Sequence, residues 1–259
     1  MSRRDQLILD CLEEKGVCTY QELQKLLGVS SMTVRRDVRR LAAKKQVIRT
    51  IGGVQRSAAP QFLHEASILS RARLNQAEKR AIVKQAMAQF IKADQTLFID
   101  GSSTSMELAR LIVASEVAIT VVTHSALIAL KLSHAPNIKI ICLGGEYDAR
   151  SGCFGGKLTE DSMQKYFVDI AFLSTKAFLP AEGAFESVIA TLRVKQLVAE
   201  HCEKLVLLVD HTKFGKRALC KVVGKDSIHA VITDAKTPPA VIQSLRKNGC
   251  EVIVAQIST

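Results

Sequence analysis

The amino-acid sequence predicts an α/β protein in which a small helical domain precedes a larger domain built on a mainly parallel sheet. In residues 1–56, apolar side chains recur at helical spacing, and Lys and Arg number 12 against 6 Asp and Glu. Beyond residue 74, short apolar runs alternate with amphipathic helices, which is the pattern of a parallel sheet with helices on both faces. The stretch 57–73 loses this periodicity and contains Pro60. We therefore expect one domain over 1–56, a linker over 57–73 and a second domain over 74–259.

The N-terminal domain is expected to contain three helices. One apolar stripe predicts a first helix over 4–14. Thr19 can cap a second helix over 20–27, because Glu22 stands at the third position as in a capping box. A Gly-containing turn then leads into a third helix that ends near Ala43. Two short helices joined by such a turn form a helix-turn-helix unit.

The segment after the third helix predicts a wing. Residues 47–51 are typical of a strand, and Gly52-Gly53 is typical of a hairpin turn that returns the chain through Val54 and Gln55. Arg49 on this hairpin adds a charge that would lie beside a DNA groove.

The third helix has two chemically different faces. Val34, Val38 and Leu41 form one apolar stripe, and Ser30 or Ser31 can cap the helix start. The other face carries four arginines, which fits a helix laid in the DNA major groove. The alternative is a solvated basic face on an ordinary surface helix. The predicted DNA-binding residues are Ser31, Met32, Thr33, Arg35, Arg36, Arg39, Arg40 and Arg49.

The charge distribution favours nucleic-acid binding by the N-terminal domain. Of the formal net charge of +11, +6 falls within residues 1–56. This local excess of positive charge is the electrostatic footprint of a nucleic-acid-binding module. The absence of Trp and the aromatic content of only 5% argue against a stacking platform for single strands. Double-stranded DNA is therefore the expected partner.

The second domain is expected to alternate strands and helices along its whole length. The predicted helices are 75–91, from 105 to 113, from 126 to 133, from 157 to about 166, 192–202 and one after Pro238-Pro239, and the predicted strands are 96–99, 118–123, 138–143, 169–174, 205–209, 230–233 and 252–255. Residues 151–156 are expected to form a glycine-bearing loop.

Polar loops follow several of these strands and predict a small-molecule site. In open parallel sheets, ligands bind outside the carboxyl ends of the strands. The loop Asp100–Thr104 joins hydroxyls and a glycine to the start of a helix, which suits an anion such as phosphate, and Lys213 could add a point charge. The alternatives are an ordinary strand-to-helix loop and a solvated lysine. His124 could serve as a hydrogen-bonding spacer, and Lys195 could occupy a salt bridge or the surface.

Several kinds of site are not indicated by the sequence. The seven cysteines include no Cys-x-x-Cys pair, so neither a zinc site nor a thioredoxin motif is predicted. Most are expected to be small buried hydrophobes in a reducing cytoplasm. No Ser/His/Asp order and no metal-ligand spacing stands out, and we expect no cofactor and no metal. Without a signal-type run or about 18 uninterrupted apolar residues, the protein is expected to be soluble, cytoplasmic and free of membranes.

The same residues resemble a known family over nearly the whole chain. In the N-terminal domain the resemblance rests on Val29-Ser30, Thr33-Val-Arg-Arg-Asp-Val38, Arg49 and Gly52-Gly53. In the second domain it rests on Lys79, Asp100–Thr104, Thr123-x-Ser125, Leu143-Gly-Gly145, Gly155, Asp169, Lys195 and Asp210-His-Thr-Lys-Phe214. These segments resemble transcriptional regulators of the DeoR type. The chain departs from that pattern at Gly101, which comes one place earlier than the usual glycine, at His124 in place of Asn, and at Ile51 in place of His.

The resemblance implies a winged helix-turn-helix joined to a sugar-phosphate-sensing domain similar in fold to ribose-phosphate isomerases. It further implies a repressor of sugar or polyol catabolic genes that a phosphorylated sugar metabolite releases from its operator. We expect a homo-oligomer, dimer or tetramer, because one winged module covers only a short DNA site. The expected effector-binding residues are Asp100, Gly101, Ser102, Ser103, Thr104, Thr123, His124, Ser125, Gly144, Gly145, Lys195, Asp210 and Lys213.

Two other functions are kept open. An isomerase-like enzyme would use Asp100, Glu186, Lys195 or Asp210 as acid and base, although no carboxylate–lysine pair stands out by spacing. An architectural DNA binder would keep the second domain without a ligand. We predict that the protein is not an enzyme, because an isomerase would not need the basic N-terminal module.

Overall fold

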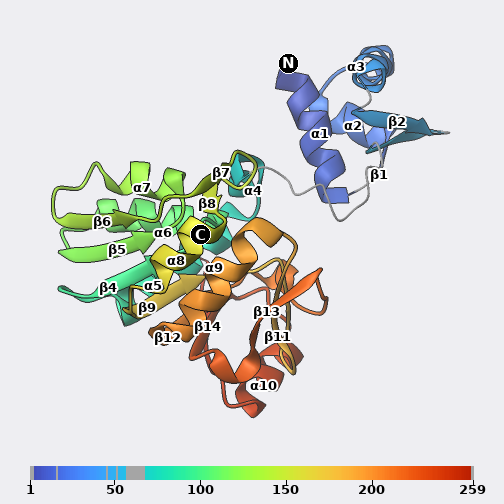
Figure 1. Cartoon of the computed structure of the whole chain (residues 1–259). Helices are drawn as coiled ribbons and strands as arrows, with labels where there is room; N and C mark the ends of the chain where they lie inside the picture. Colours follow the sequence, from blue (N-terminus) through green and yellow to red (C-terminus); the bar gives the residue numbers. More distant parts are fainter. Residues whose placement is uncertain (1–2, 16, 45, 51, 57–67, 258–259) are drawn as a thin grey trace. The chain divides into compact units, whose positions relative to one another are not determined.

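In the computed structural model, the described part of the N-terminal unit packs three helices with a three-stranded antiparallel sheet (Figure 1). The structure describes residues 3–15, 17–44, 46–50, 52–56 and 68–257, and the chain divides into two compact units, Met1–Ala66 and Ser67–Thr259. The elements of the N-terminal unit are α1 (Arg3–Lys15), β1 (Val17–Thr19), α2 (Tyr20–Leu27), α3 (Ser31–Ala43), β2 (Val47–Thr50) and β3 (Gly53–Arg56).

The helix starts follow the capping residues in the sequence. The Thr19 hydroxyl accepts a hydrogen bond from the Glu22 amide at 3.2 Å, and the Glu22 carboxylate accepts one from the Thr19 amide at 2.8 Å. This reciprocal pair is the predicted capping box. Gly28 ends α2 in the left-handed conformation, with φ of 63°, which favours glycine. Ser30, rather than Ser31, caps α3 by accepting from the Thr33 amide at 3.4 Å.

The wing has one more strand than predicted. The hairpin of β2 and β3 is present, although Ile51 lies outside the described residues, and the short strand β1 pairs with β3 through Cys18 and Val54. Three residues are too few to show alternation in the sequence, so β1 was not predicted. The apolar face of α3 is buried as predicted, and it completes a core that includes Ile8, Leu12, Cys18, Tyr20, Leu23, Val34, Val38, Leu41, Val47 and Val54.

A seven-stranded parallel sheet forms the centre of the C-terminal unit, in the order β15-β14-β12-β9-β4-β5-β6. This confirms the predicted fold class. The strands are β4 (Thr96–Ile99), β5 (Ile119–Thr123), β6 (Ile138–Cys142), β9 (Val168–Leu173), β12 (Cys202–Leu208), β14 (Ala230–Asp234) and β15 (Glu251–Ala255). The chain runs outward from β4 through β5 to β6 and then crosses to β9 on the other side of β4. The strand order therefore reverses between β4 and β9.

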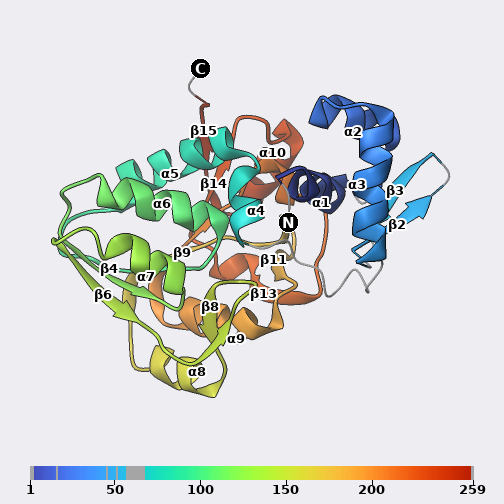
Figure 2. The same cartoon turned by 90° about the horizontal axis from the view of Figure 1, so that it is seen from above.

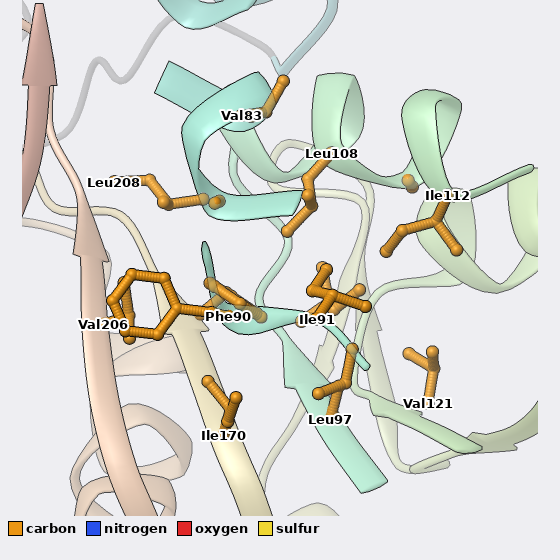
Figure 3. Packing of buried hydrophobic residues seen from close by; sticks show 14 of the residues in the cluster. Val83, Phe90, Ile91, Leu97, Leu108, Ile112, Val121, Ile170, Val206 and Leu208 are labelled. Atoms are coloured by element: carbon orange, nitrogen blue, oxygen red, sulfur yellow. The ribbon is translucent and has the colours of Figure 1, made fainter. Parts of the chain in front are cut away.

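Helices cover both faces of this sheet (Figure 2). The helices α5, α6 and α7 pack on one face, and α8, α9 and α10 pack on the other. Figure 3 shows the first of these interfaces, where Phe90, Leu108 and Ile112 lie against strand residues such as Leu97 and Val121. The helices of this unit are α4 (Ile68–Arg73), α5 (Gln76–Phe90), α6 (Ser103–Val113), α7 (Ala126–Leu132), α8 (Lys157–Met163), α9 (Ile189–Glu200) and α10 (Pro239–Lys247), with single 3-10 turns at His211–Lys213 and Lys225–Ser227.

Short antiparallel strands that were not predicted accompany the main sheet. They are β7 (Glu146–Asp148) paired with β8 (Cys153–Gly155), and a second sheet of β10 (Ala177–Leu179), β11 (Gly183–Glu186) and β13 (Cys220–Gly224). The prediction of a simple loop over 151–156 was therefore wrong. Strands of three to five residues give too short a pattern to recognise.

The predicted linker over 57–73 is also partly wrong. Residues 68–73 form the helix α4, whose first residue Ile68 is buried and bonds through its amide to the carbonyl of Arg150 at 3.4 Å. This short segment holds too few apolar positions to show helical periodicity, and packing against the C-terminal unit stabilises it. The remainder of the predicted linker lies outside the described residues.

Candidate DNA-binding surface and effector site

The face of α3 opposite the core presents four of the predicted DNA-binding side chains to solvent, those of Met32, Arg35, Arg36 and Arg39. Met32 is 80% exposed, and Arg36 and Arg39 are also exposed. The Arg35 guanidinium carbon lies 4.5 Å from the centre of the Tyr20 ring on α2, a cation–π contact that orients this arginine. Ser31 and Thr33 in the first turn are half-buried, and Arg49 is exposed on the wing strand β2.

Arg40 differs from the other arginines of α3 because carboxylates of its own unit bind it. Its guanidinium contacts Asp5 on α1 and lies 2.8 Å from a carboxylate oxygen of Asp37, and Arg4 reaches the other oxygen of Asp37 at 3.0 Å. Hydrogen bonding to Asp5 and the nearby charge of Asp37 raise the pKa of Arg40. Arg40 therefore links α3 to α1.

Sequence reasoning did not identify this network. Asp37 is fully buried, and it lies on the inner face of α3 beside Val34 and Val38. The sequence did contain a signal for it. Asp37 comes three residues after Val34 and directly before Val38, so it lies next to the apolar stripe, and a buried charge needs a partner.

The first predicted effector loop lies at the reversal point between β4 and β9. Asp100 follows β4 and is fully buried. Its carboxylate accepts hydrogen bonds from the Ser102 amide at 3.1 Å, the Ser105 hydroxyl at 2.6 Å and the Ser174 amide at 2.9 Å. Ser102 caps α6, so the first turn of α6, with the buried residues Ser103 and Thr104, begins at this end of the sheet. Asp100 thus ties the loop after β4 to the loop after β9.

Lys195 on α9 completes a buried charge cluster with Asp100 and Glu186. Its ammonium lies 2.7 Å from the Glu186 carboxylate, 2.9 Å from the carbonyl oxygen of Ser174 and 3.2 Å from the Asp100 carboxylate. Burial alone would lower the pKa of Lys195, but the two carboxylates raise it well above its ordinary value. The structure therefore contains a carboxylate–lysine cluster that the spacing of these residues in the sequence did not reveal. It confirms that Lys195 forms salt bridges and excludes a position for Lys195 on the surface.

The loop after β5 lies next to the end of β4. The Thr123 hydroxyl donates to the carbonyl of Ile99 at 2.7 Å, and the Ser125 hydroxyl caps α7 by accepting from the Ile128 amide at 3.4 Å. His124 is fully buried against Phe98, and neither ring nitrogen has a hydrogen-bond partner among the described residues. Burial lowers its pKa to about 4, so the imidazole is neutral at physiological pH. The spacer interpretation of His124 is therefore wrong for its side chain.

Three predicted glycines lie at this edge, and at two of them close packing leaves no space for a side chain. A Cβ at Gly101 would lie 2.0 Å from the sulfur of Cys153. A Cβ at Gly145 would lie 2.1 Å from the Thr159 hydroxyl, which itself donates to the carbonyl of Gly144 at 2.7 Å. Gly101 is therefore required for the approach of the β4 and β8 segments.

Positive charges gather around Asp210 at the end of β12. Burial lowers the pKa of Lys213, Asp210 raises it, and Lys176 and Arg71 lower it further, so these groups lie close enough to interact. Burial also lowers the pKa of Lys79 to about 8, and Asp210, Lys213 and Arg71 act on it as well. Lys79 and Lys213 thus both lie close enough to the Asp210 carboxylate to interact with it.

Lys79 and Arg71 were not among the predicted site residues, although Lys79 gave a usable signal. It lies on the same helix face as Ile82, Ala86 and Phe90, and only 3% of it is exposed. A lysine on an apolar stripe needs a partner or a ligand for its charge.

The structure also revises the prediction for the cysteines. Cys18 and Cys153 are buried, but Cys142 is exposed and the other four are half-buried, so most are not core residues. Among the described residues, no group of three or more His, Cys, Asp or Glu side chains is placed to hold a metal ion. In the same part of the chain, no helix combines the length and hydropathy that a membrane span requires.

A winged helix-turn-helix with an exposed arginine face, followed by a separate α/β unit with polar loops at its strand ends, is the architecture of a DNA-binding transcriptional regulator. The comparisons with known proteins agree. The chain matches the DeoR-like helix-turn-helix domain over residues 4–58 and the DeoR C terminal sensor domain over 74–235.

The relatives cover nearly the full chain. It is 31% identical to the HTH-type transcriptional regulator GolR of Listeria innocua, over 98% of both chains. It is 28% identical to the glycerol-3-phosphate regulon repressor of Escherichia coli, over 94% of this chain and 95% of the relative. It is 29% identical to the L-fucose operon activator of Haemophilus influenzae, over 92% and 94%. The chain belongs to the DeoR family of transcriptional regulators.

Solved structures with a similar fold include ribose 5 phosphate isomerase A from Neisseria gonorrhoeae. The similarity has a TM-score of 0.41 at 18% identity and covers 55% of this chain and 56% of the isomerase.

Proposed function

We propose that this protein represses sugar or polyol catabolic genes and leaves its operator when a phosphorylated sugar or polyol binds the C-terminal unit. The observation that carries the proposal is that Lys79 and Lys213 both lie near the buried Asp210 carboxylate at the end of β12. A phosphate group bound here would add negative charge and strong hydrogen-bond acceptors beside these two lysines.

We infer that the phosphate binds between Lys79 and Lys213 on one side and the amino end of α6 on the other. Lys79 interacts with Glu107 on α6, and α4 packs on α6, so both halves of the site belong to neighbouring elements. Backbone amides and hydroxyls of Ser103 and Thr104 would bind the phosphate oxygens. Asp210 would accept a sugar hydroxyl. Asp100 has a different role, because hydrogen bonds and Lys195 already occupy both of its oxygens.

Thr123, His124, Ser125, Gly144 and Gly145 stay proposed parts of the same site. Thr123 and Ser125 shape the loop after β5, and the carbonyl of Gly144 is held by Thr159. The ring nitrogens of His124 have no hydrogen-bond partner among the described residues, and a ligand hydroxyl would supply one. Gly101, Ser102 and Lys195 position the loops.

For DNA, we propose that α3 lies in the major groove with Ser31, Met32 and Thr33 at its reading end. Arg35 and Arg36 would contact bases or phosphates and Arg39 phosphates, with Arg49 on the wing beside them. Arg40 would hold α3 in place instead of contacting DNA directly, because Asp5 and Asp37 bind its guanidinium. Two such modules in a dimer or tetramer would read repeated half-sites.

The charge cluster of Asp100, Glu186 and Lys195 argues against the isomerase alternative. Burial alone would raise the pKa of each carboxyl, but Lys195 lowers both. All three groups therefore keep their charge near neutral pH, whereas an acid–base catalyst needs a pKa near the operating pH. The proposal is thus a cytoplasmic regulator without catalytic activity.

A thermal-shift screen of sugar phosphates, followed by operator titration, tests this function. A ligand at 100 times its Kd stabilises the unit that binds it by about 2.7 kcal/mol. The corresponding free sugars serve as controls for the phosphate. A selected sugar phosphate should then weaken binding to an operator fragment, and Lys213→Ala should reduce that response. Stabilisation without any change in operator affinity would contradict induction. Absence of any stabilising sugar phosphate would favour the architectural binder, and turnover of one would favour the isomerase.

A further inference from the structure

Lys79 holds the end of the helix that begins the C-terminal unit. Its ammonium donates to the carbonyl of Arg71 at 2.6 Å and to the carbonyl of Leu74 at 2.5 Å. The last carbonyls of a helix lack the usual amide partner four residues further on, so a cation placed there adds a charge-assisted bond to them, here beside the bond from the Leu74 amide to the Arg71 carbonyl. With six residues, α4 is too short to be stable alone, and the contact with Lys79 on α5 contributes to its position.

A second contact links the turn between α4 and α5 to Asp210. Asn75 adopts a left-handed conformation with φ of 49°, and its side-chain amide donates to the Asp210 carboxylate at 3.3 Å. The carbonyl of Asn75 accepts the Lys79 amide at 3.0 Å. The turn from Arg71 to Asn75 is therefore fastened at two points to groups of the proposed phosphate site.

We propose that α4 and the turn after it form the latch by which an anion in the C-terminal unit controls the tether of the DNA-binding unit, with Lys79 as the coupling residue. This inference rests on the proposed function, which locates the bound anion near Asp210 and Lys213.

The physical reason is the number of donors on an ammonium group. Lys79 has three, and among the described residues two of them have carbonyl partners. An anion bound by the third donor completes the set and fixes the nitrogen between α4 and the ligand. Because burial lowers the pKa of Lys79 to about 8, a nearby anion also keeps the group protonated and its bonds to the carbonyls charge-assisted.

The position of α4 in the chain turns this local restraint into a signal. Ile68 is its first residue, and the chain reaches it directly from the segment that leads out of the N-terminal unit. Fixing the end of α4 therefore restricts the point from which the DNA-binding unit is tethered, and a change in that restraint changes which arrangements of two DNA-binding units are accessible.

Hydrogen exchange of the full-length protein, measured by mass spectrometry, tests the latch. The probe is inorganic phosphate, compared with chloride at equal ionic strength. We expect exchange in the peptide over 68–75 to slow by about tenfold with phosphate, the factor that one hydrogen bond to a charged group gives. Lys79→Met should lose this protection. Lys84→Met, which removes an exposed lysine from the same helix, should keep it.

The outcomes separate the latch from the anion site. Protection of residues 210–213 without protection of 68–75 would overturn the latch and leave the anion site standing. No protection in either segment would overturn both. Full protection of 68–75 in a folded Lys79→Met variant would overturn the role of Lys79. The comparison of phosphate with chloride in the unmodified protein decides the proposal even if Lys79→Met does not fold.

Discussion

Replacing Lys195 by Met should destabilise the C-terminal unit strongly. The side chain of Lys195 is 7% exposed, and those of Asp100 and Glu186 are 0% and 8% exposed. Removing one partner from a buried ionic cluster costs about 3–5 kcal/mol, because the remaining charge stays buried without compensation. Methionine matches the volume of the lysine stem, so the loss of packing is small.

The pH dependence of this variant distinguishes charge from packing. In the unmodified protein burial alone would raise the pKa of Glu186, and Lys195 lowers it, so the cluster stabilises the fold above the ordinary carboxyl range and loses that effect as pH falls. Without Lys195, the two largest causes that lower the pKa of Glu186 are lost, and burial, the largest cause of all, raises it. The loss of stability should therefore be largest near neutral pH and shrink as the pH falls through the raised pKa of Glu186 in the variant, where its carboxyl takes up a proton.

Urea denaturation followed by circular dichroism measures this effect, with Lys84→Met as the control. A second variant that combines Lys195→Met with Glu186→Leu should recover at least half of the lost stability, since it also removes a buried charge. A loss below about 1 kcal/mol for Lys195→Met, or no recovery in the double variant, would refute the reasoning.

Further predictions concern DNA, packing, pH and assembly. Arg36→Ala should weaken specific operator binding by about 1–3 kcal/mol in a fluorescence anisotropy titration, and unchanged affinity would remove Arg36 from the base contacts. Arg39→Ala should weaken operator and random DNA alike and reduce the salt slope by about one, whereas an unaltered slope would exclude a phosphate contact. Gly101→Ala should cost about 1–3 kcal/mol in unfolding experiments, because its Cβ would lie 2.0 Å from the Cys153 sulfur. Adding Cys153→Ala to Gly101→Ala should recover the lost stability, and a double variant as unstable as the single one would show that the strain does not come from the Cys153 sulfur. Because the pKa values of Asp100 and Asp210 are lowered, stability should fall as the pH drops below about 4, and an acid-stable unit would contradict this. The full-length protein should sediment as a dimer or tetramer at micromolar concentration, and a monomer would count against paired half-sites.

Local chemistry explains why much of the fold could be predicted. Thr19, Glu22, Gly28 and Ser30 act on their own neighbours, so the boundaries of α2 and α3 followed from the sequence. The period of the apolar residues likewise placed α5 and the central strands of the sheet. Because parallel strands end on the same side, their polar loops were expected to meet, and the bond from the Ser174 amide to Asp100 shows this at the reversal point.

Contacts between distant segments could not be predicted in the same way. Asp37 meets Arg4 across 33 residues, and Asp210 meets Asn75 across 135. Lys195 forms its cluster with residues of two other elements. Charge alone did not show that Lys195 and Arg40 would be bound internally, because only the fold decides which partners come within reach. The three-residue strands were missed for another reason, since pairing with a neighbour and not their own sequence makes them strands.

The separate core of the N-terminal unit has a consequence for how such proteins can be recombined. Its cluster of buried residues is drawn from the described residues of that unit alone, with Ile8, Val34 and Val54 fully enclosed. Nothing in that cluster needs to be rebuilt when a different C-terminal partner is attached. A graft at the boundary near Ala66 would therefore carry this operator preference to another sensor, and a duplication of the coding segment could do the same in evolution. The limit of such exchange is size, because a unit of this length is only marginally stable and would depend on its new partner to bring two copies together on DNA.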